Sequence, residues 1–460
     1  MSKISATLGL FNLLLLAVFA ASAIGIAGIS STAGMGLAFT QLTGFLSLGM
    51  MAFAAVLSTR QKWLEPSLGG LDKMYRLHKW LGIGALAIAV VHWLVRTGGG
   101  HRPPVEAAAA AANAVASTVT AAASAAAPVE RVIDPAVAAT QTLFPSLMGL
   151  AHMIAQPVLF LLIALIAAAL VKLIPYRIFQ KLHFVMAAVF LVFAFHALVL
   201  MRPEYWPTPF GWATVTMAVT GSIASVYSLV RHFIGFPGAE ARVVETHYYP
   251  ELKVLEVDLE VDERWKGHRP GQFAFVVTDL KEGAHPFTIA TSWNPANRRI
   301  GFIAKELGDF TSGLRREFHK GARVKIEGPY GRFTFDSAKP CQIWIGGGIG
   351  ITPFVAKMRE RAGTPANTQI HLFHTTRQVS EDALNRMRAD ADAASVDLHV
   401  LVSPRDGHLD AKQIMETVAD WKDASFWFCG PTGFGAILRK DLVGAGLQPA
   451  DFHQELFEMR

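Results

Sequence analysis

The chain has 460 residues, enough for two or three domains, and 52% of them are apolar. Its formal net charge is +6, but many Lys and Arg residues flank long apolar runs, and no basic stripe is interleaved with aromatic residues. We therefore exclude a nucleic-acid-binding protein. Two cysteines, Cys341 and Cys429, form no CxxC motif, which favours a reducing compartment over a disulfide framework.

Six apolar runs before about Ile234 are long enough to cross a bilayer, at about 20 residues each. They cover residues 8–29, 38–58, 75–96, 146–171, 179–200 and 209–233. The first run ends in small residues, as a cleavable signal peptide does. Its apolar stretch is longer than the core of such a signal, so we interpret it as a retained helix.

Positive charges predict the orientation of these helices. Segments 58–77 and 172–181, together with Arg231, carry Lys and Arg and would all lie on one side of a six-helix bundle. The positive-inside rule makes that side the cytoplasm, so the soluble half is expected there too. An Ala-rich insert at residues 103–140 is expected to be a flexible or partly helical external excursion. A seventh span there would reverse the topology.

Four histidines lie inside the predicted membrane helices, at His78, His92, His183 and His196. An ionisable or coordinating side chain is costly in lipid and usually marks a function. The third and fifth runs cross in the same direction, so topology pairs His78 with His183 on the cytoplasmic side and His92 with His196 outside. Such pairs suit two b-type haems, each held by an imidazole on both faces. The alternative is four packing histidines bonded to backbone carbonyls.

The spacing within each helix differs by one residue. His78 and His92 are 14 residues apart, which is about 21 Å and about 40° short of four turns. His183 and His196 are 13 residues apart, about 140° short of four turns, which a straight helix does not explain. Arg96, one turn beyond His92, would contact a haem propionate or the external acceptor, or simply snorkel to the interface. We interpret His152 as a packing or propionate-contact residue.

The soluble half divides into two patterns. From about residue 240 to 335, short strands separated by turns such as Pro270-Gly271 predict a small antiparallel β-barrel. From residue 342 onward, apolar strands alternating with helices predict a parallel α/β sheet. We therefore expect a transmembrane helical bundle at 1–236, a barrel domain at 237–338 and an α/β domain at 339–460.

Glycine-rich turns in the soluble half are candidate phosphate sites. The strand Ile343–Ile345 runs into a turn with Gly347, Gly348, Gly350 and Thr352, where the backbone could approach a pyrophosphate at the start of a helix. Cys429-Gly430-Pro431 ends a later strand at the same carboxyl edge, where ligands bind in such sheets. A purely structural turn is the alternative.

The predicted barrel carries a second candidate site. In His285-Pro286-Phe287-Thr288 an aromatic ring could stack on a flavin and a hydroxyl could bond to it. Gly308 and Thr311 flank the start of a helix whose N–H groups could hold the pyrophosphate of FAD.

These motifs, with Gly328–Gly331 and Glu455-Leu456-Phe457, resemble the ferredoxin–NADP reductase superfamily. Preceded by six helices with histidines spaced 14 and 13 apart, the chain resembles a bacterial member of the NADPH oxidase and ferric reductase superfamily. That resemblance implies a multi-pass protein of the bacterial inner membrane with its reductase module in the cytoplasm.

The resemblance also implies residue roles. His285, Phe287 and Thr288 would contact FAD, the glycines at 347, 348 and 350 with Thr352 would cradle the phosphates of NADPH or NADH, and Cys429 would lie near the nicotinamide. Phe457 would shield the flavin ring, although three residues follow it here whereas the family often ends on the aromatic residue. Arg377 could pair with a 2′-phosphate and favour NADPH, or be a solvated surface residue.

We therefore expect electrons to pass from cytoplasmic NAD(P)H through FAD and two haems to an external acceptor, with Phe457, Cys429 and Arg96 closest to the chemistry. The acceptor would be dioxygen, giving superoxide, or a ferric chelate. One alternative is a haem membrane protein that donates electrons to a protein partner. Another is a structural membrane protein with a degenerate reductase domain.

Overall fold

The chain forms two compact units. The computed structural model describes residues 2–23, 32–98, 135–171, 173–174, 176–235, 238–278, 283–306, 311, 313–364 and 368–455. The membrane unit comprises Met1–Arg60 and Tyr75–Phe233, and the reductase unit comprises Gln61–Met74 and Ile234–Met459. Residues 61–74 thus make their contacts with the reductase unit, although the sequence assigns them to the membrane domain.

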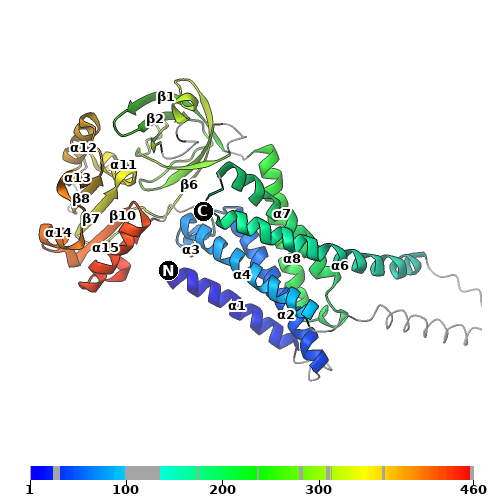
Figure 1. Ribbon diagram of the computed structural model, residues 1–460. Coiled ribbons are helices and arrows are strands. Elements are labelled where there is room, and N and C mark those ends of the chain that lie inside the picture. The colour runs from blue at the N-terminus through cyan, green and yellow to red at the C-terminus, as the bar shows by residue number, and fades with distance from the viewer. Residues whose placement is uncertain are drawn as a thin grey trace, which may run out of the picture. The chain divides into compact units, whose positions relative to one another are not determined.

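Six helices of the described chain are long and apolar enough to cross a membrane, which confirms the predicted number. They are α1 (Ser2–Ala23), α2 (Thr32–Ser58), α4 (Leu71–Gly98), α6 (Pro135–Leu170), α7 (Tyr176–Val199) and α8 (Pro209–Ile234), and a short 3₁₀ turn, η1 (Pro203–Tyr205), precedes α8. Helix α2 packs against α1 and α7, and α6 packs against α7 (Figure 1). The protein is therefore a multi-pass membrane protein.

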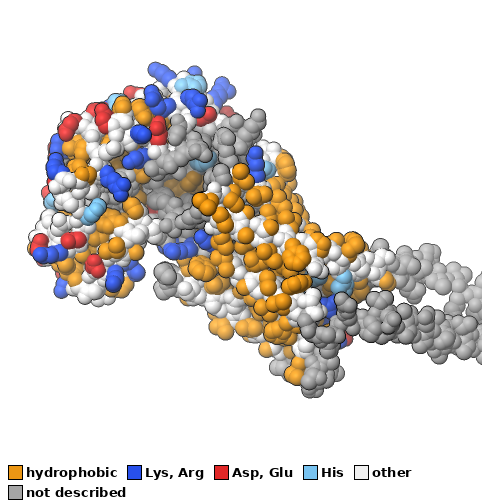
Figure 2. Space-filling model, viewed as in Figure 1, with side chains coloured by type: hydrophobic (Ala, Val, Ile, Leu, Met, Phe, Trp, Pro, Cys, Tyr) orange, Lys and Arg blue, Asp and Glu red, His pale blue; other side chains and the backbone are white. Residues whose placement is uncertain are grey.

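The surface of the membrane unit is apolar. Leu13 is 64% exposed, Trp212 69% and Ile223 65%, and hydrophobic side chains cover the visible face of the helices (Figure 2). An apolar face of this extent suits lipid rather than water. Inside, a β-carbon on Gly221 would lie 2.3 Å from the Phe190 ring, so glycine allows α8 to approach α7 closely.

The first sheet of the reductase unit is antiparallel and has six strands in the order β4-β3-β6-β1-β2-β5. The strands are β1 (Ala239–Tyr249), β2 (Val254–Val261), β3 (Phe273–Val277), β4 (His285–Thr288), β5 (Arg299–Lys305) and β6 (Arg323–Tyr330). Two short helices, α3 (Glu65–Leu68) and α10 (Leu314–Glu317), belong to the same unit. The edge strands meet at a single bridge, Ile289 to Phe302. The antiparallel sheet is as predicted, but among the described residues no continuous ladder closes it into the predicted barrel.

The second sheet is parallel, as predicted, and has five strands in the order β11-β10-β7-β8-β9. Its strands are β7 (Cys341–Gly347), β8 (Gln369–Thr376), β9 (Asp397–Val402), β10 (Ala424–Cys429) and β11 (Phe452–Gln454). The intervening helices are η2 (Gly348–Ile351), α11 (Thr352–Arg361), α12 (Glu381–Ala393), α13 (Ser403–Asp406), α14 (Ala411–Thr417), η3 (Trp421–Asp423), α15 (Thr432–Gly444) and η4 (Pro449–Asp451). Strands β7 and β10 are buried along their whole length because helices cover both faces of such a sheet.

Candidate functional site

The carboxyl edge of the parallel sheet forms a cradle from two chain segments. Strand β7 leads through Gly347 and Gly348 into η2 and then α11, whose first turn contains Thr352. A β-carbon on Gly350 would lie 2.2 Å from the carbonyl oxygen of Cys429, and one on Gly347 would lie 2.9 Å from Pro431. These two glycines are therefore required by the packing of the turn against the end of β10.

Gly348 differs from its neighbours. Its φ is +58°, a backbone conformation that residues other than glycine rarely adopt. A β-carbon at this position would have no heavy atom within 4 Å. The backbone at Gly348 is thus open to a ligand, directly before the amino terminus of α11, where N–H groups favour an anion. Of the predicted glycines that the structure describes, Gly348 is the one whose space remains free for a phosphate.

The end of β10 contributes a buried thiol. Cys429 is fully buried, and burial, followed by the charge of Glu455, raises its pKa well above the usual range. The thiol therefore stays protonated and is no nucleophile at neutral pH. Gly430 and Pro431 follow it at the surface of the cradle, and Arg377 is exposed just beyond the end of β8.

The predicted flavin strand lies at the edge of the antiparallel sheet. Residues His285 to Thr288 form β4, pair with β3 and are all half-buried. The Phe287 ring lies 5.9 Å from that of Phe302. Burial lowers the pKa of His285 to about 4, so its imidazole is neutral at physiological pH. Thr311 is described, whereas Gly308 and Phe457 lie outside the described residues.

Residues 61–74 add contacts that the sequence did not reveal. Lys62 Nζ donates to the carbonyl oxygen of Gly328 at 2.6 Å, and Glu65 Oε1 accepts from the Gly331 amide at 2.6 Å and the Leu71 amide at 3.2 Å. Burial raises the pKa of Glu65, although the two amide hydrogen bonds oppose the shift. The positive charges of this segment predict only its side of the membrane, and an isolated acidic residue such as Glu65 does not indicate a buried contact.

Glu455 also lies close to Gly331. Its Oε1 is 3.4 Å from the position that a β-carbon on Gly331 would occupy. Its Oε2 is buried without a hydrogen-bond partner in the described part of the chain. Burial raises the pKa of Glu455 well above its usual range, because desolvation disfavours the charged carboxylate.

In the membrane unit the structure brings His78 and His183 together. Their ring centroids are 5.7 Å apart and the ring planes are inclined by 67°. Nδ1 of His78 lies 2.9 Å from the carbonyl oxygen of Ala54 on α2 and donates to it. Nδ1 of His183 is buried and has no partner among the described residues, and its ring lies against Phe179 at 5.2 Å.

The structure likewise brings His92 and His196 together. Their centroids are 6.5 Å apart and the planes are inclined by 82°. Nδ1 of His92 lies 3.1 Å from the Thr40 carbonyl and 3.1 Å from the Thr43 hydroxyl. Nδ1 of His196 lies 3.0 Å from the Ala151 carbonyl on α6. Both pairs therefore form in the structure although His183 and His196 are 13 residues apart.

Arg96 and His152 also meet. An Arg96 terminal nitrogen lies 3.2 Å from Nε2 of His152, and Nδ1 of His152 lies 2.9 Å from the Met148 carbonyl. Because arginine can only donate, Nε2 of His152 accepts and Nδ1 carries the proton. Both nitrogens of His152 are therefore engaged, and neither is left for a metal.

Comparisons with known proteins match both units. The ferric reductase like transmembrane component family matches residues 43–194, and the FAD-binding domain family matches residues 239–334. A flavohemoprotein of Rhizobium meliloti is 25% identical over 212 residues, covering 41% of this chain and 52% of that protein. A glycine betaine monooxygenase reductase subunit of Pseudomonas aeruginosa is 24% identical over 207 residues, covering 41% and 56%.

Among solved structures, the flavohem-like FAD/NAD-binding domain of a nitric oxide dioxygenase from Vibrio cholerae is 21% identical, with a TM-score of 0.42, and the match covers 48% of this chain and 98% of that one. The chain spans about half the length of the curated relatives it matches.

The six apolar helices include the segment that matches the ferric reductase like transmembrane component, and the antiparallel sheet lies in the segment that matches the FAD-binding domain. In this order of segments the chain is similar to the NADPH oxidase and ferric reductase superfamily.

Proposed function

We propose that the protein moves electrons across the bacterial inner membrane, from NAD(P)H on the cytoplasmic side through FAD and two b-type haems to an external acceptor. The acceptor is dioxygen, which gives superoxide. The observation that supports this proposal most is the geometry of the two histidine pairs in the membrane unit.

The pairs fit a metal ion between their rings. An imidazole nitrogen lies about 2 Å from a metal that it binds, so two imidazoles on opposite sides of one ion have centroids roughly 6 Å apart. The measured separations are 5.7 and 6.5 Å. In His78, His92 and His196 the Nδ1 atom faces a backbone carbonyl, which leaves Nε2 for the metal and fixes the ring.

The remaining ligands would have to come with the metal. Among the described residues, no group of three or more His, Cys, Asp or Glu could hold a metal ion. A haem fits this requirement, because its porphyrin supplies the other four ligands and needs one protein ligand on each face. His78 with His183 would hold the inner haem, and His92 with His196 the outer one.

The reductase unit would hold the other two cofactors. The half-buried strand β4 and Thr311 would bind FAD, and the open backbone at Gly348 would receive the phosphates of the nicotinamide nucleotide. Arg377, exposed beyond β8, would pair with a 2′-phosphate and favour NADPH. Bound there, FAD supplies the conversion of a two-electron hydride donor into single electrons, and the haems supply one-electron carriers across the membrane.

The residues near the outer pair bear on the acceptor. With an imidazole on each face, the outer iron would have no open position, so the acceptor would be reduced at the haem edge. Arg96 is exposed and hydrogen-bonded to His152. Its positive charge would hold a haem propionate or attract an anionic acceptor.

Ferric-chelate reduction by the same electron path is the second candidate. It is favoured by the match of residues 43–194 to the ferric reductase like transmembrane component.

Membranes that contain the protein distinguish the two acceptors. NADPH is added, and oxygen uptake, external superoxide and ferric-chelate reduction are followed in parallel. We expect oxygen uptake with a superoxide signal that superoxide dismutase abolishes. Turnover that requires ferric chelate, with negligible oxygen uptake, would replace dioxygen by ferric iron as the acceptor. Purified protein without flavin absorbance would contradict the whole path and favour a haem protein that donates to a protein partner.

A further inference from the structure

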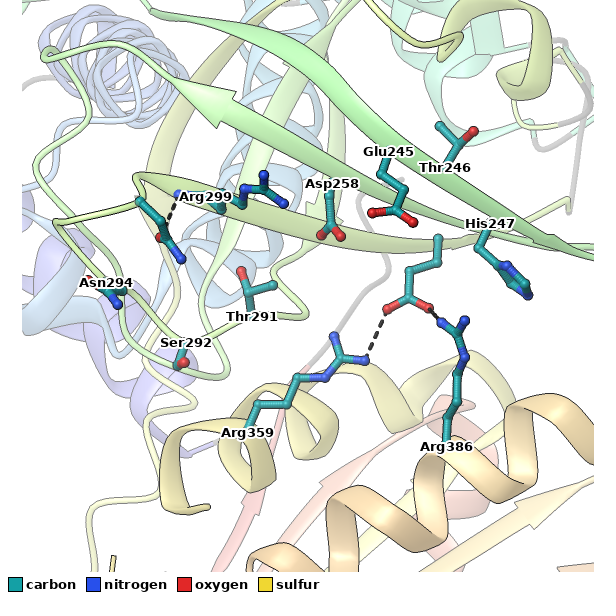
Figure 3. A pocket seen from close by; sticks show the side chains of 12 residues that line it. Glu245, Thr246, His247, Asp258, Thr291, Ser292, Asn294, Arg299, Arg359 and Arg386 are labelled. Atoms are coloured by element: carbon teal, nitrogen blue, oxygen red, sulfur yellow. Dashed lines mark hydrogen bonds and ion pairs between the residues drawn. The ribbon is translucent and has the colours of Figure 1, made fainter. Parts of the chain in front are cut away.

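Arg359, on α11, bonds to three other segments of the reductase unit. Its Nε lies 3.2 Å from Asp390 on α12, one terminal nitrogen lies 3.3 Å from the carbonyl oxygen of Ala290, and the other lies 3.0 Å from Glu256 on β2. Figure 3 shows the Arg359 and Arg386 side chains extending from their helices toward the strands. All three nitrogens of this guanidinium are therefore engaged.

Glu256 is the partner that joins the helices to the antiparallel sheet. Its side chain is 12% exposed and lies 3.0 Å from Arg359 and 3.5 Å from Arg386, and it accepts from the Tyr249 hydroxyl at 3.2 Å. Because the carboxylate is largely shielded from water, these ion pairs are screened less than surface pairs. They line one side of a pocket of about 420 Å³ between the strands and α11 and α12.

The groups that Arg359 connects lie close in sequence to both predicted cofactor sites. Ala290 follows the flavin strand β4 by two residues, and Arg359 lies two turns beyond Thr352, where the nucleotide cradle enters α11. One side chain therefore connects the segment that would contact FAD with the helix that would carry the nucleotide. Neither Arg359 nor Glu256 belongs to the predicted cofactor contacts.

We propose that Arg359, braced by Glu256, is a positioning residue that sets the distance between the nicotinamide and the flavin for hydride transfer. In that step the C4–H bond of the nicotinamide breaks, an N–H bond forms on the flavin, and the electron pair moves with the hydride. Small errors in the distance between reacting atoms lower such rates strongly. The inference rests on the first half of the proposed function, reduction of FAD by NAD(P)H, and on neither the haems nor the acceptor.

Arg361 provides a matched control on the same helix. It donates to the carbonyls of Ala394 and Thr368, which both belong to the α/β half of the reductase unit. Arg361→Met therefore removes a half-buried arginine from α11 and breaks its hydrogen bonds to Ala394 and Thr368 within the α/β half. A merely structural role for Arg359 would predict similar effects of the two substitutions.

The test is anaerobic stopped-flow reduction of the flavin by NADPH in the full-length protein. For Arg359→Met we expect the rate at saturating NADPH to fall about 10- to 100-fold, with little change in the NADPH concentration that gives half the maximal rate. Arg359→Lys should restore part of the rate, and Arg361→Met should leave it close to that of the unmodified protein. Equal effects of the two Met variants, or an unchanged rate in Arg359→Met, would overturn the proposal.

A second variant, Glu256→Gln, and melting temperatures test the proposal if Arg359→Met cannot be assayed. If Arg359→Met retains too little FAD to assay, Glu256→Gln removes the brace while leaving the Ala290 hydrogen bond, and it should slow flavin reduction in the same direction by a smaller factor. Without any turnover, the melting temperatures of Arg359→Met, Glu256→Gln and the double variant should be non-additive, because the two side chains contact each other. Additive changes would contradict the coupling. If the unmodified flavin is not reduced by NADPH at all, the proposed function fails instead.

Discussion

The two histidine pairs of the membrane unit differ in how their rings are held. In the outer pair both Nδ1 atoms face backbone carbonyls, those of Thr40 and Ala151. In the inner pair this is true of His78 alone, whereas the buried Nδ1 of His183 has no partner in the described part of the chain. A ligand ring is oriented by the hydrogen bond of its other nitrogen. The outer pair is therefore fixed on both sides, and the inner pair on one.

His268 in the reductase unit shows how a histidine that serves packing differs from these pairs. Nδ1 of His268 accepts from the Trp265 indole at 3.3 Å, and its Nε2 donates to the Thr291 carbonyl at 3.0 Å. Both nitrogens are used, so the ring has nothing left to offer a metal. His78, His92 and His196 each engage Nδ1 with a backbone carbonyl, which would leave Nε2 for a metal, as expected of ligands.

The largest effect is expected from removing a histidine of either pair. His92→Ala or His196→Ala should remove the outer of the two haems and leave the inner one, because each pair would hold its own. His78→Ala or His183→Ala should remove the inner haem and stop NADPH from reducing the outer one. Haem content and reduced-minus-oxidised spectra measure both. Loss of both haems in a correctly folded His92→Ala protein would show that the pairs are not independent.

A smaller effect should follow from crowding the outer pair. A β-carbon on Gly44 would lie 3.3 Å from Cε1 of His92, so Gly44→Ala pushes a ring that Thr40 and Thr43 already fix. We expect outer-haem retention to weaken by roughly 10-fold or more, with the inner haem unchanged. Gly82→Ala on α4 is the control, since a β-carbon there meets nothing within 4 Å. Equal retention in the two variants would argue against a tightly held outer ring.

The free energy of unfolding should depend on pH through the packing histidine, His268. Burial lowers the pKa of His268 from 6.5 to about 4. Above pH 6.5 the imidazole is neutral in both the folded and unfolded states. Between pH 6.5 and 4 the unfolded state alone binds the proton, so the free energy of unfolding falls as the pH falls, by up to about 3 kcal/mol.

His268→Gln tests this origin. The variant should be less stable at pH 7, but its free energy of unfolding should no longer fall with pH through His268. FAD release during thermal unfolding between pH 4 and 7 measures this. A variant with the full pH dependence would place its origin in other groups.

The smallest effect is expected at Arg96. Arg96→Met should leave both haems in place, since Arg96 bonds to His152 and to neither pair. It should lower the rate of acceptor reduction several-fold by removing a positive charge near the outer pair. Arg202→Met is the control, because Arg202 is occupied by Glu204 at 2.8 Å. Equal acceptor kinetics in the two variants would remove Arg96 from the proposed site.

The sequence predicts features that repeat or carry a local pattern. The six helices follow from apolar length, and the pairing of His78 with His183 follows from counting membrane crossings. Contacts between distant segments leave no such pattern. Glu65 bonds to Gly331, and Arg359 to Glu256, across more than 100 residues of chain. No motif in the sequence includes Glu65, Arg359 or Glu256. Likewise, the sequence of a glycine-rich turn does not distinguish a glycine required for packing from one that is open to a ligand. In the structure Gly350 is of the first kind and Gly348 of the second.

The most direct test of the central claim is an anaerobic absorption spectrum of the purified protein before and after addition of NADPH. We expect two bis-histidine b-type haems per FAD, both reduced by NADPH once the flavin has been reduced. A preparation that contains FAD but no haem, or haems that NADPH leaves oxidised while the flavin is reduced, would contradict the proposed path through the two histidine pairs.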